Sequence, residues 1–446
     1  MNLALKLSEE EYKKNFEELI SPFTNNAAVV EANRCLFCYD SPCTKACPTH
    51  IDIPAFIKKI VTGNLLGSAK TIFESNWIPL TCAKACPVED LCEGACVLND
   101  NDEKPIEIGR LQRFSVDNFF EADSPKLFSQ KNKNGKSVGI IGSGPAGLAC
   151  GAELSLLGYD AQIYEANKIP GGLSTWGISA YKTSKEDSLK EVELVKSLGV
   201  NIQTEVTIGK EISADDLIKK HDAIFIGIGL GESPSLNIPG EDFKGVSGAL
   251  QFIENVKEEN WSSVDVGKRV AVIGAGNTSI DAATAAKRLG AEEVMIIYRR
   301  SETEMPANNF EYRLAKNDGI VFHFLTSPVE IIGKDYVEKI KCIKMELGEA
   351  DADGRCKPKP ITDSEFEIPV DMIITALGQK ARAEFLHSLP DLKIENGCIA
   401  VDGETFQTGN PKVFAGGDCI NGGKEVVNAA YDGKQAAHDI DKFLND

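Results

Sequence analysis

The hydrophobic pattern of the chain changes near residue 130. Before that point apolar residues recur at helical spacing, as in IPAFIKKIVTGNLLGSAKTIFE (Ile53–Glu74), and alternating β-type stretches are few. A polar linker, SQKNKNGK, ends at Lys136, and short apolar runs that lead into glycine follow it. Such runs, separated by helical patterns, are typical of buried parallel strands. The pattern predicts an α/β protein with an N-terminal all-α domain.

The α/β part contains an internal repeat. KSVGIIGSGPAGL from Lys136 and KRVAVIGAGNTSI from Lys268 align without a gap, 132 residues apart. Each reads as a strand, a glycine-rich turn and a helix start, and a second strand follows each (AQIYEA, then EVMIIYRR). Two such units predict two Rossmann-like nucleotide-binding domains, the second inserted in the first. The predicted segments are 1–130 (helical domain), 131–245 and 379–446 (two parts of the first nucleotide-binding domain) and 246–378 (second nucleotide-binding domain).

The first repeat carries a complete dinucleotide fingerprint. Gly142, Gly144 and Gly147 form G-x-G-x-x-G directly after a strand and before a helix. These glycines allow a tight turn, close approach of a pyrophosphate and close packing of helix on strand. Glu165 ends the second strand, 23 residues after Gly142, where a carboxylate can accept ribose hydroxyls.

Two further features of the first domain indicate FAD. A Gly-Gly pair ending at Gly172 is typical of flavoproteins whose chain turns beneath the isoalloxazine ring. Near the C-terminus the apolar strand of VFAGGD (Val413–Asp418) stops in Gly-Gly-Asp, which can present Asp418 and backbone amides to the ribityl chain and phosphate. The alternative for Asp418 is an ordinary helix N-cap.

The second repeat has Gly274, Gly276 and Ser279 at the three glycine places, and its second strand ends in Arg299 and Arg300. An acid there would repel a 2′-phosphate, whereas guanidinium groups bind it. This favours NADPH over NADH; the alternative is an exposed pair of surface arginines. The second domain is therefore predicted to bind NAD(P)H.

Cysteines concentrate at the front of the chain, where eight of the 13 lie between Cys35 and Cys96. The first group reads C-x2-C-x4-C-x3-C-P, close to the bacterial ferredoxin run, and the second is TCAKACPVEDLCEGAC. Two four-iron clusters need eight ligands, which the eight cysteines could supply. Structural zinc is the alternative, but Pro directly after the last Cys and a spacing of four then three are awkward for a tetrahedral site.

Charge and hydropathy narrow the possible partners. The formal net charge is −19, so binding to nucleic acid or to an anionic membrane is not expected. No apolar run approaches the roughly 20 residues that span a bilayer, and the N-terminus lacks a signal-peptide pattern. The chain is predicted to be cytoplasmic.

The chain resembles a known family. The resemblance rests on the order of its features, which are the two cysteine groups, the two glycine turns and VFAGGD. The family is the electron-input module shared by glutamate synthase small subunits and the N-terminal half of dihydropyrimidine dehydrogenase. The finer resemblance is to the small subunit of bacterial NAD-dependent dihydropyrimidine dehydrogenase. It rests on GLSTWGISAYK (Gly172–Lys182), AAYDGKQAA (Ala429–Ala437) and IGRLQRF, in which Gln112 lies sixteen residues beyond Cys96.

The resemblance implies two [4Fe-4S] clusters. Their ligands do not follow the two cysteine groups of the sequence, because each cluster takes ligands from both groups. One cluster would be held by Cys35, Cys38, Cys43 and Cys96, and the other by Cys47, Cys86, Cys92 and Gln112. Cys82 would be a spectator beside the second cluster, although spacing alone leaves Cys82 and Gln112 both open as its last ligand. An uncharged amide oxygen in place of a thiolate shifts a cluster's potential.

The resemblance also implies the nucleotide contacts. For FAD these are Gly142, Gly144, Pro145, Ala146, Gly147, Glu165, Gly172, Leu173, Lys182, Gly417 and Asp418. For NAD(P)H they are Gly274, Gly276, Asn277, Thr278, Arg299, Arg300, Ala376, Leu377 and Gly378. Two departures matter. The third arginine of the NADPH-using pyrimidine enzyme is missing from SETEMPA (Ser301–Ala307), and Lys182 stands where many relatives have arginine.

These parts predict a relay in which NAD(P)H reduces FAD and electrons pass singly through the clusters. Hydride transfer between bound cofactors needs no protein acid or base, so no catalytic residue is named. No length remains for a further cofactor domain, which implies a hetero-oligomer with an FMN-containing catalytic subunit that interconverts uracil or thymine and their 5,6-dihydro forms. The alternatives are a glutamate synthase small (beta) subunit or related electron-transfer flavoprotein, and a non-catalytic protein with structural clusters.

Overall fold

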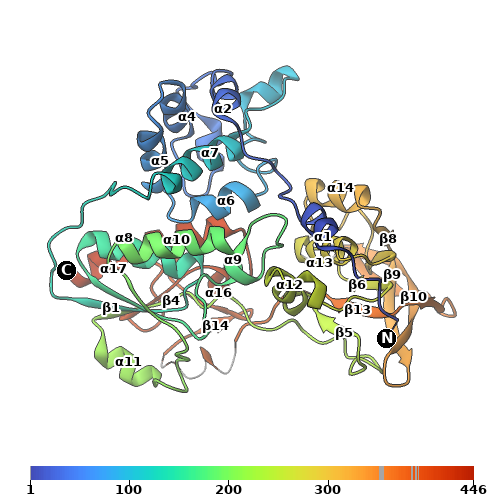
Figure 1. Cartoon of the computed structure of the whole chain (residues 1–446). Coiled ribbons are helices and arrows are strands. Elements are labelled where there is room, and N and C mark those ends of the chain that lie inside the picture. Colours follow the sequence, from blue (N-terminus) through green and yellow to red (C-terminus); the bar gives the residue numbers. More distant parts are fainter. Residues whose placement is uncertain (1, 351–355, 383–384, 387–388, 390, 446) are drawn as a thin grey trace. The chain divides into compact units, whose positions relative to one another are not determined.

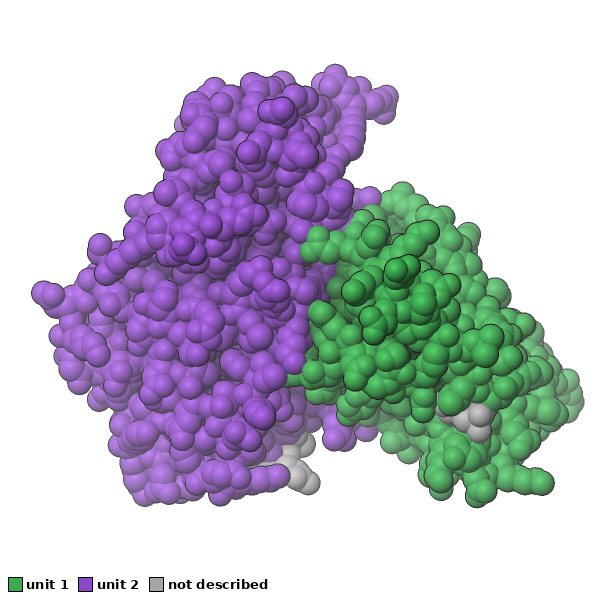
Figure 2. All heavy atoms as spheres, viewed as in Figure 1, with its two compact units in different colours: residues 1–19, 176–181, 233–379 green, residues 20–175, 182–232, 380–446 purple. Residues whose placement is uncertain are grey.

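The computed structural model of the chain describes residues 2–350, 356–382, 385–386, 389 and 391–445. It contains two compact units (Figure 2). Unit 1 comprises Met1–Leu19, Trp176–Tyr181 and Ser233–Gln379, and unit 2 comprises Ile20–Thr175, Lys182–Glu232 and Lys380–Asp446. The boundaries of the four segments predicted above stay a prediction.

Unit 2 opens with a bundle of short helices (Figure 1). In α4 the side chains of Ile53, Phe56, Ile57 and Ile60 are buried at spacings of three and four, which turns one apolar stripe inward. Asp52 caps this helix by accepting from the Ala55 amide at 3.1 Å. The helices here are α2 (Asn25–Ala32), α3 (Pro42–Ala46), α4 (Ile53–Val61), α5 (Leu65–Phe73), α6 (Pro79–Ala85), the 3-10 turn η1 (Val97–Asn101) and α7 (Ile108–Glu121).

The rest of unit 2 is built on a five-stranded parallel sheet in the order β16-β4-β1-β2-β3. Its central strands are buried along nearly their whole length, as expected for a sheet covered on both faces. The strands are β1 (Ser137–Ile141), β2 (Asp160–Tyr164), β3 (Asn201–Gln203), β4 (Ala223–Ile226) and β16 (Val413–Ala415), with a small hairpin of β14 (Ile394–Glu395) and β15 (Cys398–Ile399). The helices are α8 (Pro145–Leu157), α9 (Leu173–Trp176), α10 (Lys185–Ser197), α11 (Ala214–Lys220), α16 (Asp418–Asn421) and α17 (Val426–Asn445).

Unit 1 repeats this plan with a parallel sheet in the order β5-β13-β6-β7-β8. An antiparallel sheet, in which β10 pairs with β9, β11 and β12, is added to it. The strands are β5 (Val246–Gly248), β6 (Arg269–Ile273), β7 (Glu293–Ile297), β8 (Val321–His323), β9 (Thr326–Gly333), β10 (Val337–Ala350), β11 (Cys356–Pro360), β12 (Phe366–Pro369) and β13 (Met372–Thr375). The helices are α1 (Glu9–Asn15), α12 (Ala249–Lys257), η2 (Trp261–Ser263), α13 (Asn277–Arg288) and α14 (Asn309–Asn317).

The predicted fold class is confirmed. A helical N-terminal region precedes two Rossmann-like parallel sheets, and β16 returns to the first sheet after the second is complete. One local difference concerns the first nineteen residues, which the sequence groups with the helical region but which pack in unit 1. The Ala4 amide donates to the Val266 carbonyl at 2.9 Å, and Phe16 stacks on Trp261 with ring centroids 4.7 Å apart.

Candidate functional site

The first glycine turn, between β1 and α8, is shaped by close backbone contacts. Gly142 has φ +96°, and a Cβ on Gly147 would lie 2.0 Å from the Gly142 carbonyl oxygen. Gly144 is the N-cap residue of α8 and has no side chain to bond the first amides of that helix. Those amides are therefore oriented to receive an anionic group, which fits the pyrophosphate of a dinucleotide.

Glu165, at the end of β2, is held rigidly beside this turn. Its Oε2 accepts from the Ser143 amide at 3.0 Å and from the Ser143 hydroxyl at 2.6 Å, and its Oε1 accepts from the Asn167 amide at 2.8 Å. A carboxylate offers about four acceptor positions, so a ribose hydroxyl can still be accommodated. The sequence motif does not reveal the role of Ser143, although this residue lies inside it.

Three distant segments meet at the N-terminus of α8, where Pro145 and Ala146 form the first turn. A Cβ on Gly172 would lie 2.7 Å from the Gly144 Cα, and one on Gly417 would lie 3.1 Å from the Ala146 Cβ. Leu173 follows this contact and is 39% exposed. The fold therefore brings the predicted FAD residues together around a cradle in which added side chains would clash.

Two acidic groups lie at the C-terminal side of this cradle. The Gly417 amide donates to Asp432 Oδ2 at 3.0 Å, and Asp418 Oδ1 accepts from the Lys424 amide at 3.2 Å. Burial raises the pKa values of Asp418 and Asp432 above the ordinary value. Burial also raises the pKa of Glu425, and the positive charge of Lys182 opposes this effect. Lys182 therefore lies near Glu425.

The second glycine turn, between β6 and α13, is built alike. Gly274 has φ +124°, and a Cβ there would lie 2.2 Å from the Ala376 carbonyl oxygen. Gly276 is the N-cap residue of α13 and again leaves the first amides without a side-chain acceptor. The predicted turn at Ala376, Leu377 and Gly378 therefore lies beside the glycines, with Leu377 38% exposed. This arrangement fits the pyrophosphate of a nicotinamide nucleotide.

The residues expected to read the nucleotide lie around this second turn. Asn277 Oδ1 accepts from the Asn308 amide at 3.1 Å, and the neighbouring Thr278 is exposed. Because β6 and β7 are adjacent, the two arginines that follow β7 lie on the sheet edge that carries the turn. Arg299 is exposed, whereas the Arg300 Nε donates to the Cys356 carbonyl at 3.2 Å.

The first set of cysteines surrounds a cavity in the helical region. It encloses about 380 Å³ of atom-free space, part of it open to solvent, and apolar side chains of α4 complete its wall. Burial and the neighbouring thiols of Cys35 and Cys96 raise the pKa of Cys43 to about 11. The four cysteines that line the cavity are Cys35, Cys38, Cys43 and Cys96. A converging set of four half-buried cysteines fits a four-iron cluster.

The second set gathers at the ends of α3 and α6. Cys47 and Cys86 are the C-cap residues of these helices, and Cys92 follows in the next loop. The hydrogen bond with Cys82, burial and the nearby Cys92 and Cys47 raise the pKa of Cys86 well above the ordinary value. Among the described residues, no group of three or more His, Cys, Asp or Glu side chains is arranged to hold a single metal ion. The thiolates of a cubane bind different irons, so they stand further apart than the ligands of one ion.

Gln112, on α7, lies against the start of α6. Its Nε2 donates to the Pro79 carbonyl at 2.7 Å, and the side chain is buried. This bond fixes the amide plane and directs the oxygen Oε1 elsewhere, so the oxygen is the atom that can serve as a ligand. Gln112 and Cys82 both remain compatible with the second set.

A buried carboxyl fastens α6 to the flavin-type domain, and the sequence gives no sign of it. Glu191, on α10, accepts from the Leu80 amide at 2.6 Å and from the Thr81 amide at 3.1 Å, and burial raises its pKa to about 8. One turn earlier, Asp187 pairs with the buried Lys84 at 2.7 Å. These partners lie more than a hundred residues apart, and no short motif announces such pairing.

Comparison with known proteins shows which family this chain belongs to. Residues 12–124 match the family model described as dihydropyrimidine dehydrogenase domain II, 4Fe-4S cluster, and residues 136–433 match pyridine nucleotide-disulphide oxidoreductase. The glutamate synthase [NADPH] small chain of Escherichia coli is 36% identical, over 97% of this chain and 94% of the relative. The chain belongs to the glutamate synthase small-chain family. It is an NAD(P)-dependent FAD oxidoreductase with a 4Fe-4S domain.

Other relatives show the range of this glutamate synthase small-chain family. The NADP(+)-dependent formate dehydrogenase subunit beta of Moorella thermoacetica is 35% identical, over 91% of this chain and 60% of the relative. Both relatives are subunits of multi-subunit enzymes, and the family type is an NAD(P)H-oxidising electron-transfer flavoprotein subunit. In the described part of this chain no bilayer-spanning helix is found.

Solved structures support the fold alone. Mycobacterium tuberculosis FprA in complex with NADPH superposes with a TM-score of 0.58 at 22% identity, over 70% of this chain and 85% of FprA. Thioredoxin reductase of T. acidophilum gives 0.54 at 20% identity, over 70% of this chain and all of that protein. The shared part is the pair of nucleotide-binding sheets.

Proposed function

We propose that this chain is the input subunit of a hetero-oligomeric oxidoreductase, taking hydride from NAD(P)H and delivering single electrons to a partner subunit. The observation that carries the proposal is the presence of two converging cysteine sets in the same compact unit as the glycine cradle of the flavin type. When bound, FAD would supply the two-electron to one-electron conversion that links a nicotinamide to iron–sulfur clusters.

The residues of the chain would act by binding and orientation. The amides at the start of α8 and the rigid Glu165 would hold the FAD pyrophosphate and ribose. The amides at the start of α13 would hold the nicotinamide nucleotide, with Arg299 positioned for a 2′-phosphate. The two cluster sets would be Cys35, Cys38, Cys43 and Cys96, and Cys47, Cys86, Cys92 and Gln112. No protein group needs to carry a proton in the hydride step.

Two partners are candidates, and different observations favour each. The curated relatives favour a glutamate synthase type of partner, because the matched small chains cover nearly the whole of this chain. A partner with FMN that interconverts uracil or thymine and their dihydro forms is favoured by Gln112 and by the Gly172–Lys182 segment. The glutamate synthase type has the broader support.

The first experiment tests the relay itself. Protein prepared without oxygen should contain iron, sulfide and FAD, and its flavin absorbance should bleach on addition of NADPH or NADH. Protein that lacks iron and sulfide, or whose bound flavin does not bleach with either nucleotide, would contradict the proposal.

The second experiment identifies the partner. The native complex should be purified from its source and supplied with NADPH plus either uracil or glutamine with 2-oxoglutarate. Turnover with glutamine and 2-oxoglutarate supports the glutamate synthase type, and turnover with uracil supports the pyrimidine type. A co-purified partner that uses neither pair would exclude both assignments while leaving the relay intact.

A further inference from the structure

One peptide group of α6 is held from both sides by side chains of other helices. On one side, Gln112 of α7 donates from Nε2 to the Pro79 carbonyl at 2.7 Å. On the other side, the Leu80 amide donates to Oε1 of Glu191, on α10, at 2.6 Å. The Pro79 carbonyl and the Leu80 amide belong to the same peptide bond. The three groups therefore form one hydrogen-bonded chain that runs from α7 through α6 to α10.

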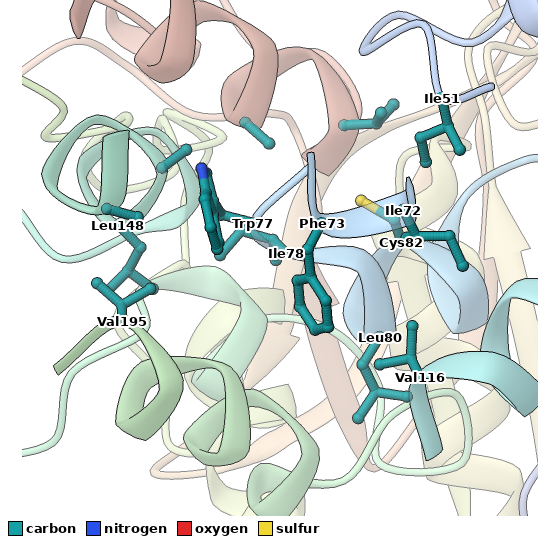
Figure 3. Packing of buried hydrophobic residues seen from close by; sticks show 14 of the residues in the cluster. Ile51, Ile72, Phe73, Trp77, Ile78, Leu80, Cys82, Val116, Leu148 and Val195 are labelled. Carbon is teal, nitrogen blue, oxygen red and sulfur yellow. The ribbon is translucent and has the colours of Figure 1, made fainter. Parts of the chain in front are cut away.

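This chain is shielded from water. Leu80 is 0% exposed and Glu191 is 1% exposed. Figure 3 shows Leu80 in a core of buried apolar side chains that includes Val116 of α7 and Val195 of α10. Glu191 also accepts from the Thr81 amide at 3.1 Å and from the Thr81 hydroxyl. Without this carboxyl group, two amides at the start of α6 would lose their acceptor where water cannot replace it.

The direction of the chain determines what Gln112 presents to the second cysteine set. The Pro79 carbonyl can only accept, so the Gln112 nitrogen faces it and the oxygen Oε1 is left for another partner. When the Leu80 amide donates to the carboxyl group, the peptide is polarised and its carbonyl becomes a better acceptor. Glu191 therefore strengthens the hydrogen bond that fixes the Gln112 side chain, although the two residues lie on different helices.

The same turn of α10 also holds the loop of the flavin cradle. Thr175, which follows the Gly-Gly pair, donates its hydroxyl hydrogen to the Pro170 carbonyl at 2.8 Å. Its oxygen lies 2.8 Å from the hydroxyl oxygen of Ser188, which must then be the donor. Ser188 and Glu191 are three residues apart and so lie on one face of α10. This face contacts both the flavin loop and the start of α6.

We propose that Glu191 is a positioning residue of the second cluster: through the Pro79–Leu80 peptide it holds Gln112 in the orientation in which the amide oxygen can bind iron. The proposal rests on the proposed function, because it requires a cluster at the second set with Gln112 among its ligands. Groups that hydrogen-bond a metal ligand orient that ligand and affect metal affinity. A side chain that only joined two helices would not act on one cluster alone.

The test measures the loss of iron from the whole protein, prepared without oxygen, to an iron chelator, and EPR identifies the cluster that is lost. Glu191→Leu fills the space of the carboxyl group but accepts no hydrogen bond, and one cluster should lose iron about 10–100-fold faster. Glu191→Gln keeps an acceptor oxygen for both amides and should restore the unaltered rate. If Glu191→Leu does not fold, Glu191→Asp withdraws the carboxyl group by one methylene and should show a smaller acceleration.

A double variant separates positioning from general support. Gln112→Ala should accelerate iron loss from the same cluster, and adding Glu191→Leu should change nothing further, because Glu191 acts through Gln112. The matched control is Glu153→Ala, which removes the acceptor of Trp77 Nε1 at 3.0 Å. This variant weakens another contact of the helical region with the flavin-type domain but leaves the Pro79–Leu80 peptide untouched, so it should keep the unaltered rate.

Several results would count against these assignments. An unaltered rate in Glu191→Leu, or an additive effect in the double variant, would overturn the proposal. Equal acceleration in Glu153→Ala would overturn it as well, because loosening of the helical region would then be sufficient. An unaltered rate in Gln112→Ala would exclude Gln112 as a ligand and overturn the proposal while leaving the relay intact. Absence of clusters from the unaltered protein would instead refute the proposed function.

Discussion

The two glycine turns share one backbone plan and differ in what surrounds it. Beside the first, Glu165 is 6% exposed and is held by Ser143 and Asn167. Beside the second, Arg299 is exposed and Ser279 replaces the third glycine. A rigid buried carboxylate suits a cofactor that stays bound, whereas an exposed cation suits a nucleotide that enters and leaves. The comparison indicates that surrounding side chains, not the turn, distinguish a resident group from an exchanging one.

The largest expected effect comes from closing the first turn. In Gly147→Ala the new Cβ would lie 2.0 Å from the Gly142 carbonyl oxygen, which is backbone and cannot rotate away. We expect a loss of about 1–3 kcal/mol in unfolding free energy together with loss of most of the bound flavin. Flavin-to-protein ratio and thermal melting measure both. Full flavin content with an unchanged melting temperature would contradict the close packing described.

The next effect comes from removing the carboxylate. Glu165→Ala leaves the Ser143 and Asn167 amides without their acceptor and removes the proposed ribose contact. Hydrogen bonds to charged groups contribute about 1.5–3 kcal/mol, so FAD should bind at least tenfold more weakly to flavin-depleted protein. Fluorescence titration with FAD measures this, and Glu165→Gln should lose less. Equal FAD affinity in the unaltered protein and both variants would show that Glu165 does not contact FAD.

A smaller and more selective effect is expected at the second turn. Arg299→Ala should raise KM for NADPH by about tenfold, the value of one charge-assisted hydrogen bond, and leave KM for NADH and flavin content unchanged. Lys334→Ala, an exposed charge on the β9–β10 turn, is the matched control. Both KM values can be measured by steady-state reduction of an artificial electron acceptor with NADPH or NADH. Equal changes for both nucleotides would show that Arg299 does not contact a 2′-phosphate.

The smallest effect is expected at Ser279. Its hydroxyl lies 3.5 Å from the Ala376 carbonyl oxygen, the limit of a hydrogen bond. Ser279→Ala should therefore change unfolding free energy by less than about 1 kcal/mol and leave KM for NADPH nearly constant. A loss of unfolding free energy as large as that of Gly147→Ala would show that the Ser279 hydroxyl stabilises the second turn, contrary to this expectation.

The sequence predicts what is local. The repeat at Lys136 and Lys268 predicts both parallel sheets, because strand, turn and helix follow each other within one short segment. The antiparallel sheet of β9 to β12 and the packing of the first nineteen residues in unit 1 are not predicted, since both depend on pairing between distant segments. Spacing alone groups Cys96 with Cys82, Cys86 and Cys92; the family resemblance is what predicts its place with Cys35, and both residues line the same cavity.

The site is predicted less completely than the fold. Gly142, Gly144 and Gly147 follow from the needs of a tight turn, and their surroundings match those needs. Glu191 escapes notice because a buried carboxyl acquires its role only from partners that the fold supplies.

The clamp of Glu191 and Asp187 on α6 limits how such proteins can be rearranged during evolution. A gene fusion that replaced the helical region alone would leave two acidic side chains of α10 facing a foreign surface without their partners. Exchange of this region between lineages therefore requires that α6 and α10 be inherited together or that both acids change at once.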